Sequence, residues 1–301
     1  MREAGIHQRP APPVYTSVRP AGLWSSVLRA LSRSRSTTIG GGIVLLVLLV
    51  AILAPLLSPY DPLGIDVPSR LVGPGPEHLF GTDNMGRDIF SRVVFGARIS
   101  LLIGSLVVAC AAGVGIVLGL LAGYNNKLDR VLMRIMDGLM AFPTTLLAIA
   151  LMAALGARLS NVIIALAIVF TPRVARVVRS VTLVVRELDY VQAAQALGAA
   201  DSRILARHVL PNCLAPVIVQ GTFIFAESVL AEAALSFLGV GLPPYIPSWG
   251  TIITAGRMFM QTAPWITIFP GVAILVAVLG LNLLGDGLRD LADPRLRGRL
   301  G

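Results

Sequence analysis

Long apolar runs alternate with shorter polar segments from residue 39 almost to the end of the chain. An α-helix rises about 1.5 Å per residue, so about twenty apolar residues cross a hydrocarbon core about 30 Å thick. Six runs come close to this length, which predicts six transmembrane helices. They are Ile39–Leu57, Ile99–Gly123, Val131–Leu155, Asn161–Val185, Ala215–Leu238 and Ile266–Leu284.

The fourth run is the least regular, because its apolar part is short and ends before Pro172. Three arginines at helical spacing follow the proline: Arg173, Arg176 and Arg179. Proline lacks the amide hydrogen that a helix interior needs, so we expect a kink at Pro172 and another at Pro143 in the third run. The residues after Pro172 either continue this helix or leave the membrane.

The basic residues between the runs predict an orientation. With the N-terminus inside, 19 of the 25 lysine and arginine residues fall on the cytosolic side. Because cytosolic segments of membrane proteins carry an excess of such residues, we expect both termini in the cytosol. The segment 58–97 then lies outside the cell.

Composition agrees with a membrane protein. The chain has 301 residues, of which 55% are hydrophobic and 14% charged, and its mean hydropathy is +0.79. A soluble domain of this size could not bury so much apolar surface, so the lipid bilayer is the expected solvent. The net charge of +9 does not predict a nucleic-acid partner, because the basic residues lie between apolar runs and form no single stripe.

Motifs of enzyme chemistry are missing from the sequence. The single lysine, Lys127, is not part of a GxxxxGK[ST] loop, and neither GxSxG nor HExxH occurs. The two cysteines and three histidines have no metal-ligand spacing. We therefore predict a chain that is not an enzyme and holds no cofactor or metal. Gly115, Gly119 and Gly123, at four-residue spacing, predict close packing of the second helix against a neighbour.

The polar connection 186–212 predicts a helix, a turn and a second helix. Tyr190–Leu197 consists of good helix formers and Gly198 ends the helix. Asp201 or Ser202 is the expected cap of the second helix, which we expect to end before Pro211. Small alanines on the first helix and two arginines on one face of the second are suited to docking on a partner protein.

The same connection contains a motif. QAAQALG, nine further residues and then HVLP resemble the EAA loop of permeases from binding-protein-dependent ABC importers. Gln192 replaces the usual glutamate and His208 the usual isoleucine. The resemblance implies a coupling helix that docks on a separate ATPase, which binds ATP and magnesium. The coupling residues that it implies are Gln192, Ala193, Ala194, Gly198, Arg203, Arg207, Leu210 and Pro211.

Two further stretches, His78–Arg92 and Leu284–Arg295, are similar to the C-type permeases of the dipeptide, oligopeptide and nickel group. This resemblance implies an all-α integral membrane protein with six transmembrane helices in a type I ABC importer bundle. The implied divisions are a cytosolic tail over 1–38, a first transmembrane helix over 39–57, an extracytoplasmic segment over 58–97, a core permease domain over 98–285 with a coupling loop at 186–212, and a cytosolic tail over 286–301.

The resemblance also implies function and partners. We expect one half of the translocation pathway of a di- and oligopeptide importer, in a bacterial or archaeal plasma membrane. The implied partners are a homologous B-type permease, ATPase subunits and an extracytoplasmic substrate-binding protein. Nickel or glutathione is the alternative cargo. A secondary transporter is a second class of function, but the six runs show no internal repeat.

Acidic residues in the fifth run are candidates for the translocation path, because carboxylates are costly inside a membrane unless they are paired or face water. The candidate lining residues are Glu227, Ser228, Glu232 and Ser236. The alternative is that the two glutamates tie helices together through hydrogen bonds.

The outward GTDNMGRD stretch mixes charged residues with glycine, which is typical of a loop that meets another protein. The candidate contact residues for the binding protein are Gly81, Thr82, Asp83, Gly86, Arg87 and Asp88. The alternative is that this stretch folds over the helix bundle and braces it.

Overall fold

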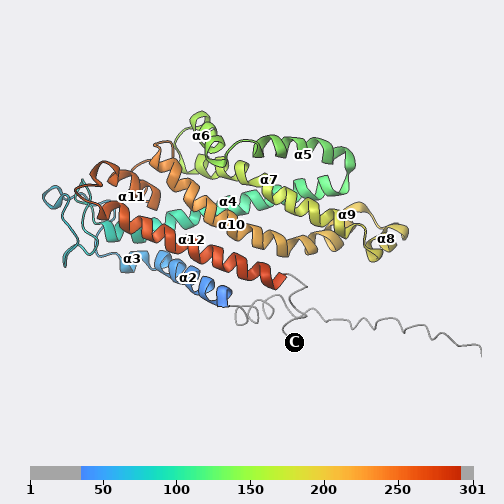
Figure 1. The fold of residues 1–301 in the computed structure, drawn as a ribbon, viewed down its shortest axis with the longest axis horizontal. Helices are drawn as coiled ribbons and strands as arrows, with labels where there is room; N and C mark the ends of the chain where they lie inside the picture. Colours follow the sequence, from blue (N-terminus) through green and yellow to red (C-terminus); the bar gives the residue numbers. More distant parts are fainter. Residues whose placement is uncertain (1–34, 293–301) are drawn as a thin grey trace, which may run out of the picture.

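The computed structural model describes residues 35–292, so the predicted tails 1–38 and 286–301 lie largely outside it. The described chain is a bundle of long helices (Figure 1), with one isolated bridge between Thr82 and Asp88 and no strand. Five helices in this range are long and apolar enough to cross a membrane, or six if a bent pair counts as one span. The predicted all-α membrane fold is confirmed.

Each predicted run contains a long helix or a pair of helices, and short helices join them. They are α2 (Arg35–Ile52), α3 (Ala54–Leu57), α4 (Ile89–Tyr124), α5 (Asn126–Met140), α6 (Thr144–Leu155), α7 (Leu159–Val185), α8 (Asp189–Ala196), α9 (Asp201–Ile204), α10 (Leu210–Phe237), α11 (Trp249–Gly256) and α12 (Trp265–Ala292).

Helix α4 begins ten residues before the predicted second span. Asp88 caps it, because its carboxylate accepts a hydrogen bond of 2.7 Å from the Ser91 amide. Residues 89–97, which the sequence placed in the outward segment, are therefore the first turns of the helix. The cap is a local signal that hydropathy does not detect.

The third predicted span is broken into two helices at Pro143, where the sequence predicted only a kink. Helices α5 and α6 meet at an angle of 94°. The corner is at Pro143, which is the N-cap residue of α6. A proline restricts the residue before it to extended backbone and cannot donate within a helix, so α5 ends at Met140 and the chain turns.

The fourth span is continuous. Helix α7 runs through Pro172 to Val185 and includes all three arginines that follow the proline. The residues after Pro172 therefore continue the same helix.

Close packing of α4 on α7 depends on the three predicted glycines. A Cβ atom on Gly119 would lie 2.6 Å from both the Ala175 carbonyl oxygen and the Val178 Cβ. Gly115 and Gly123 face Val174 and Thr182 in the same way. The absent side chains let the two backbones approach, and the packing prediction is confirmed.

We expect Gly119→Val to destabilise the bundle by about 1–3 kcal/mol, because its side chain would push α4 away from α7. The measurement is the midpoint of thermal unfolding in detergent. Gly113→Val is the matched control, since Gly113 lies on the same helix and a Cβ atom there would have no atom of the described residues within 4 Å. Equal shifts for the two variants would contradict the packing argument.

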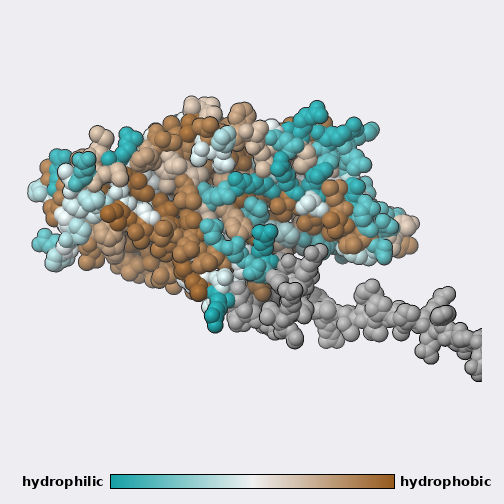
Figure 2. Space-filling view, in the orientation of Figure 1, coloured by the Kyte–Doolittle hydropathy of each residue, from teal (hydrophilic) through white to brown (hydrophobic). Residues whose placement is uncertain are grey.

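The surface divides by polarity along the long axis of the bundle (Figure 2). Apolar residues cover the region of α2 and α12, which pack side by side. Hydrophilic residues are concentrated at the end that carries α5 and α8, here named the α8 end, with some apolar residues among them. An apolar belt between polar ends is the pattern of a protein that spans a bilayer.

Candidate functional site

Helix α8 lies at the tip of the α8 end (Figure 1). It is eight residues long and is followed by Gly198, which has a φ of +81°. The Gly198 amide donates a hydrogen bond of 2.9 Å to the Gln195 carbonyl oxygen. A glycine in the left-handed region is a common helix stop, so the predicted first helix and its end are confirmed.

The second helix of the loop does not end before Pro211, and this prediction was wrong. Helix α9 passes through a π-helical turn, Leu205–Val209, directly into α10. Pro211 has no amide hydrogen to donate, and the wider turn instead lets Leu210 donate to the Leu205 carbonyl oxygen. The chain thereby stays helical across the proline.

The predicted cap of the second helix was also wrong. Ala200 is the N-cap residue and makes no side-chain cap. The Asp201 carboxylate instead accepts a hydrogen bond of 2.6 Å from the Tyr124 hydroxyl at the end of α4. This bond ties the loop to the bundle.

The predicted coupling residues lie mostly on the surface of the loop. Ala194 and Leu210 are half-buried, and the other six are exposed: Gln192, Ala193, Gly198, Arg203, Arg207 and Pro211. Val191 and Ile204 are fully buried and anchor the two helices to the bundle. The loop is therefore a fixed platform with an exposed outer face.

Leu197, which the sequence reading did not single out, is the most exposed large apolar residue of the loop, at 88%. It is the C-cap residue of α8, immediately before Gly198. At this position its side chain is available for contact with a partner protein. Its signal in the sequence was only its position next to the helix-ending glycine.

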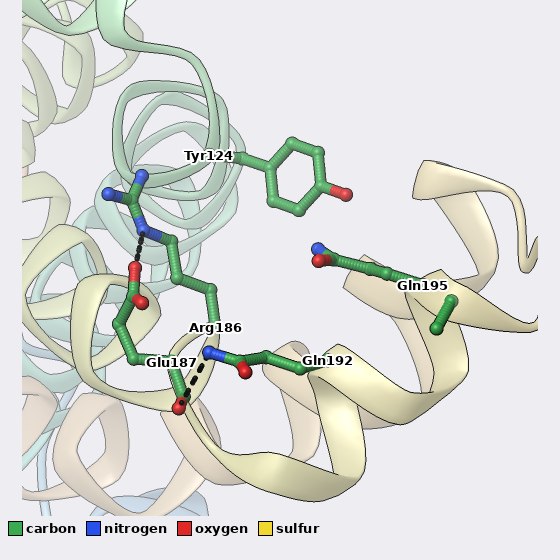
Figure 3. A pocket seen from close by; sticks show the side chains of 6 residues that line it. Tyr124, Arg186, Glu187, Gln192 and Gln195 are labelled. Carbon is green, nitrogen blue, oxygen red and sulfur yellow. Dashed lines mark hydrogen bonds and ion pairs between the residues drawn. The ribbon is translucent and has the colours of Figure 1, made fainter.

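A cleft of about 600 Å³ separates α8 from the end of α4 (Figure 3). Its lining is polar: Tyr124, Arg186, Glu187, Gln192, Gln195 and Ala196. Gln192 donates a hydrogen bond of 3.3 Å to the Glu187 carbonyl oxygen, and Arg186 donates one of 2.9 Å to the Gly123 carbonyl oxygen. Gln192 thus helps to hold α8 against the preceding turn.

The polar stripe on α10 faces the interior of the chain. Glu232 is fully buried, and its carboxyl accepts hydrogen bonds of 2.8 Å from the Ser236 and Ser248 hydroxyls. Ser228 is buried and donates to the Ile224 carbonyl oxygen of its own helix. These residues join α10 to the start of α11, as the alternative reading had it, and within residues 35–292 they line no open path.

Glu227 is different, because 43% of its side chain is exposed. It pairs with Arg173 of α7 at 2.5 Å. The two glutamates of α10 therefore have separate environments, one inside the chain and one on a face of the bundle.

The six residues predicted to contact the binding protein are all buried, so in this structure they present no surface to another protein. Asp83, which is 1% exposed, accepts hydrogen bonds from the Arg87 Nε atom at 2.6 Å and the Met85 amide at 2.8 Å. Asp88 contacts His78 at 2.9 Å. The stretch braces the end of the bundle opposite α8, as the alternative prediction had it.

Arg92 belongs to the same buried cluster, although the sequence reading gave it no role. It is 1% exposed, lies 4.0 Å from the Asp83 carboxylate and donates a hydrogen bond of 3.2 Å to the Pro62 carbonyl oxygen. The cluster therefore connects the start of α4 to the loop that precedes it.

Comparison with known families decides the identity of the fold. Residues 115–298 match the family described as the inner membrane component of binding-protein-dependent transport systems. Residues 22–74 match the N-terminal transmembrane domain of oligopeptide transport permease C. The chain belongs to the binding-protein-dependent permeases. Within this family it is a C-type permease of the dipeptide and oligopeptide group.

Relatives of the permease match it over most of their length. The dipeptide transport system permease protein DppC of Alkalihalophilus pseudofirmus is 45% identical over 284 residues, which cover 94% of this chain and 92% of that protein. A Brucella suis protein whose name places it in a peptide transport system is 53% identical, with 89% and 91% covered. The glutathione transport system permease protein GsiD of Pectobacterium atrosepticum is 44% identical, with 91% and 92% covered.

Family membership gives the coarse setting of the permease. It is a multi-pass protein of the membrane in an ABC transporter, and permeases of this family work with an ATPase and a binding protein. The exposed platform at the α8 end contains the QAAQALG stretch and lies within the range that matches the family.

Proposed function

We propose that the permease forms one half of the translocation pathway of an ATP-driven importer for di- and oligopeptides. A homologous B-type permease forms the other half, and a separate ATPase that binds ATP and magnesium docks on α8. The observation that carries the proposal is the exposed platform of α8, with Leu197 at its tip. The sequence has no phosphate-binding loop of its own, so the chain itself is not the ATPase.

The orientation proposed from the basic residues agrees with this arrangement. The α8 end contains the coupling loop, with Arg186, Arg203 and Arg207, and helix α5, with Lys127, Arg130 and Arg134. Such segments favour the cytosolic side of the inner membrane. Both termini are then cytosolic, and the braced segment 58–88 faces outward.

Peptides are the cargo that the relatives favour. Two of the three relatives described above are named for peptide or dipeptide transport, and the third is named for glutathione. Glutathione is itself a short peptide with a free ammonium and free carboxylates. A free ammonium and a free carboxylate on one short molecule are the chemistry that these cargoes share.

Reconstitution in liposomes tests the proposal. The permease is combined with its cognate B-type permease, ATPase and binding protein, and uptake of a radiolabelled dipeptide is measured. We expect uptake that needs ATP and the binding protein. Uptake by the isolated chain under a proton gradient without ATP would instead identify a secondary transporter. ATP-driven uptake of glutathione or nickel without dipeptide uptake would reassign the cargo.

A further inference from the structure

Three arginines of α7 each pair with an acid from another helix. Arg173 contacts Glu227 of α10 at 2.5 Å and Arg176 contacts Asp137 of α5 at 2.5 Å. Arg179 binds Asp129 of α5 through two hydrogen bonds. Because the arginines are three residues apart, successive pairs are displaced by about 4.5 Å along the axis of α7.

The row of pairs begins at the polar α8 end and extends into the apolar part of the bundle. Arg173 lies 12 residues before the end of α7 at Val185, which corresponds to about 18 Å of helix. Counted from Leu159 at the other end of α7, a hydrocarbon core about 30 Å thick extends to about residue 179, which places Arg173 and Arg176 in its last third before the α8 end. Ionised residues at such depth mark functional sites by default.

The two pairs farthest from the α8 end, those of Arg173 and Arg176, are partly exposed on the surface of the chain. The Arg176 and Asp137 side chains are 46% and 61% exposed, and those of Arg173 and Glu227 are 31% and 43% exposed. Such exposed charges do not face lipid tails, because the loss of hydration costs several kcal/mol per ion. They therefore face either water or another subunit. In Figure 2 hydrophilic residues continue from the α8 end toward the middle of the molecule.

The charges of these two pairs balance. Two guanidinium groups and two carboxylates are already matched, so they need no countercharge from another chain. A guanidinium binds a carboxylate in a two-pronged geometry, and a carboxylate accepts hydrogen bonds from an ammonium. A row with no net charge can bind both ends of a zwitterion weakly. Weak binding is needed because a transported molecule must also dissociate from each site along the route.

We propose that this charged row, Arg173, Arg176, Glu227 and Asp137, lines the inner half of the substrate route and binds the charged ends of a zwitterionic peptide in turn. The arginines take the peptide carboxylate, and the acids take its ammonium group. The proposal rests on the proposed function of the permease as part of a peptide importer.

Cysteine labelling in the assembled transporter tests whether the row faces water. Asp137→Cys is placed in a chain that carries Cys110→Ser and Cys213→Ala, and a charged thiosulfonate reagent is added. A thiol reacts as its thiolate, which needs water around it. We expect Asp137→Cys to react at least tenfold faster than Ile135→Cys. Ile135 is the matched control, because it is 52% exposed and points to the opposite face of α5.

Two outcomes of the labelling would overturn the proposal. Equal rates at the two positions would remove the distinction between a wet and a dry face. Reaction of Asp137→Cys in the isolated permease but not in the assembled transporter would show that the row is an interface with another subunit.

Substrate analogues test recognition of the charged ends. The binding protein is saturated either with a dipeptide or with its C-terminal amide, and the maximal uptake rate is measured. We expect Arg176→Gln to slow uptake of the dipeptide about tenfold and to leave the rate of the amide unchanged. Arg176→Lys, which keeps the positive charge, is expected to restore most of the dipeptide rate.

The results separate the two levels of the argument. A wild-type transporter that carries no peptide would contradict the proposed function. A wild-type transporter that carries the dipeptide, together with equal slowing of both cargoes by Arg176→Gln, would contradict the charged row alone and indicate a structural role for the ion pair.

Discussion

A transporter that carries Leu197→Asp loses ATP-driven peptide uptake and binds its ATPase more than tenfold more weakly. Leu197 is 88% exposed at the tip of α8. Burial of a leucine side chain contributes about 1.5–3 kcal/mol, which is a factor of ten or more in affinity. An aspartate at this position loses that contribution and adds a charge that must be stripped of water. Co-purification of the ATPase and uptake in liposomes are the measurements.

Leu197→Met is the control for this variant, because it conserves volume and apolar character. It should bind the ATPase and support uptake as the wild type does. Deletion of Ala193–Gly198 is the severe form of the same test. Undiminished ATPase association and uptake after the deletion would show that α8 is not the docking element.

Asp83→Ala is expected to destabilise the end of the permease opposite α8 by about 3–5 kcal/mol, because it removes one partner from a buried ionic cluster. Arg87 and Arg92, both buried, would lose the carboxylate that faces them. The amides of Met85 and Arg87 would also lose their acceptor. The measurement is the thermal unfolding midpoint of the purified permease in detergent.

Asp66→Ala provides the comparison for Asp83→Ala. Asp66 lies in the same outward segment but is exposed, and its carboxylate accepts a hydrogen bond from the nearby Ser69 hydroxyl. Exposed substitutions of this kind usually change stability by less than about 0.5 kcal/mol. A similar loss of stability for both variants would mean that the buried cluster is not what holds the segment.

Much of the helical framework could be predicted from hydropathy, because the bilayer requires long apolar helices and little else satisfies the backbone. The packing role of the three glycines of α4 could also be predicted, since their four-residue spacing keeps them on one face of the helix. The corner between α5 and α6 could not be predicted in the same way. A window over 131–155 averages across Pro143 and cannot distinguish a kink from a turn of 94°.

The site was predicted less completely than the fold. The motif located α8 and its terminal glycine, but motif matching does not report which side chains point outward, so Leu197 was missed. The charged residues of the GTDNMGRD stretch suggested an exposed surface for contact with the binding protein. Burial of Asp83 with its arginines depends on contacts between distant parts of the chain. The four-residue spacing of the polar stripe on α10 could likewise be predicted. The hydrogen bond from the Ser248 hydroxyl to Glu232 could not, because Ser248 lies in another segment.

The π-helical turn at Leu205–Val209 has a mechanical consequence. Because it keeps the chain helical past Pro211, α9 and α10 form one rod of 37 residues from Asp201 to Phe237. A rod of this length spans about 55 Å, so a tilt of about 5° moves its far end by about 5 Å. A force applied next to α8 therefore tilts the whole rod. The tilt moves Glu227, which lies within α10, and the far part of α10, where Glu232 bonds to Ser248 at the start of α11.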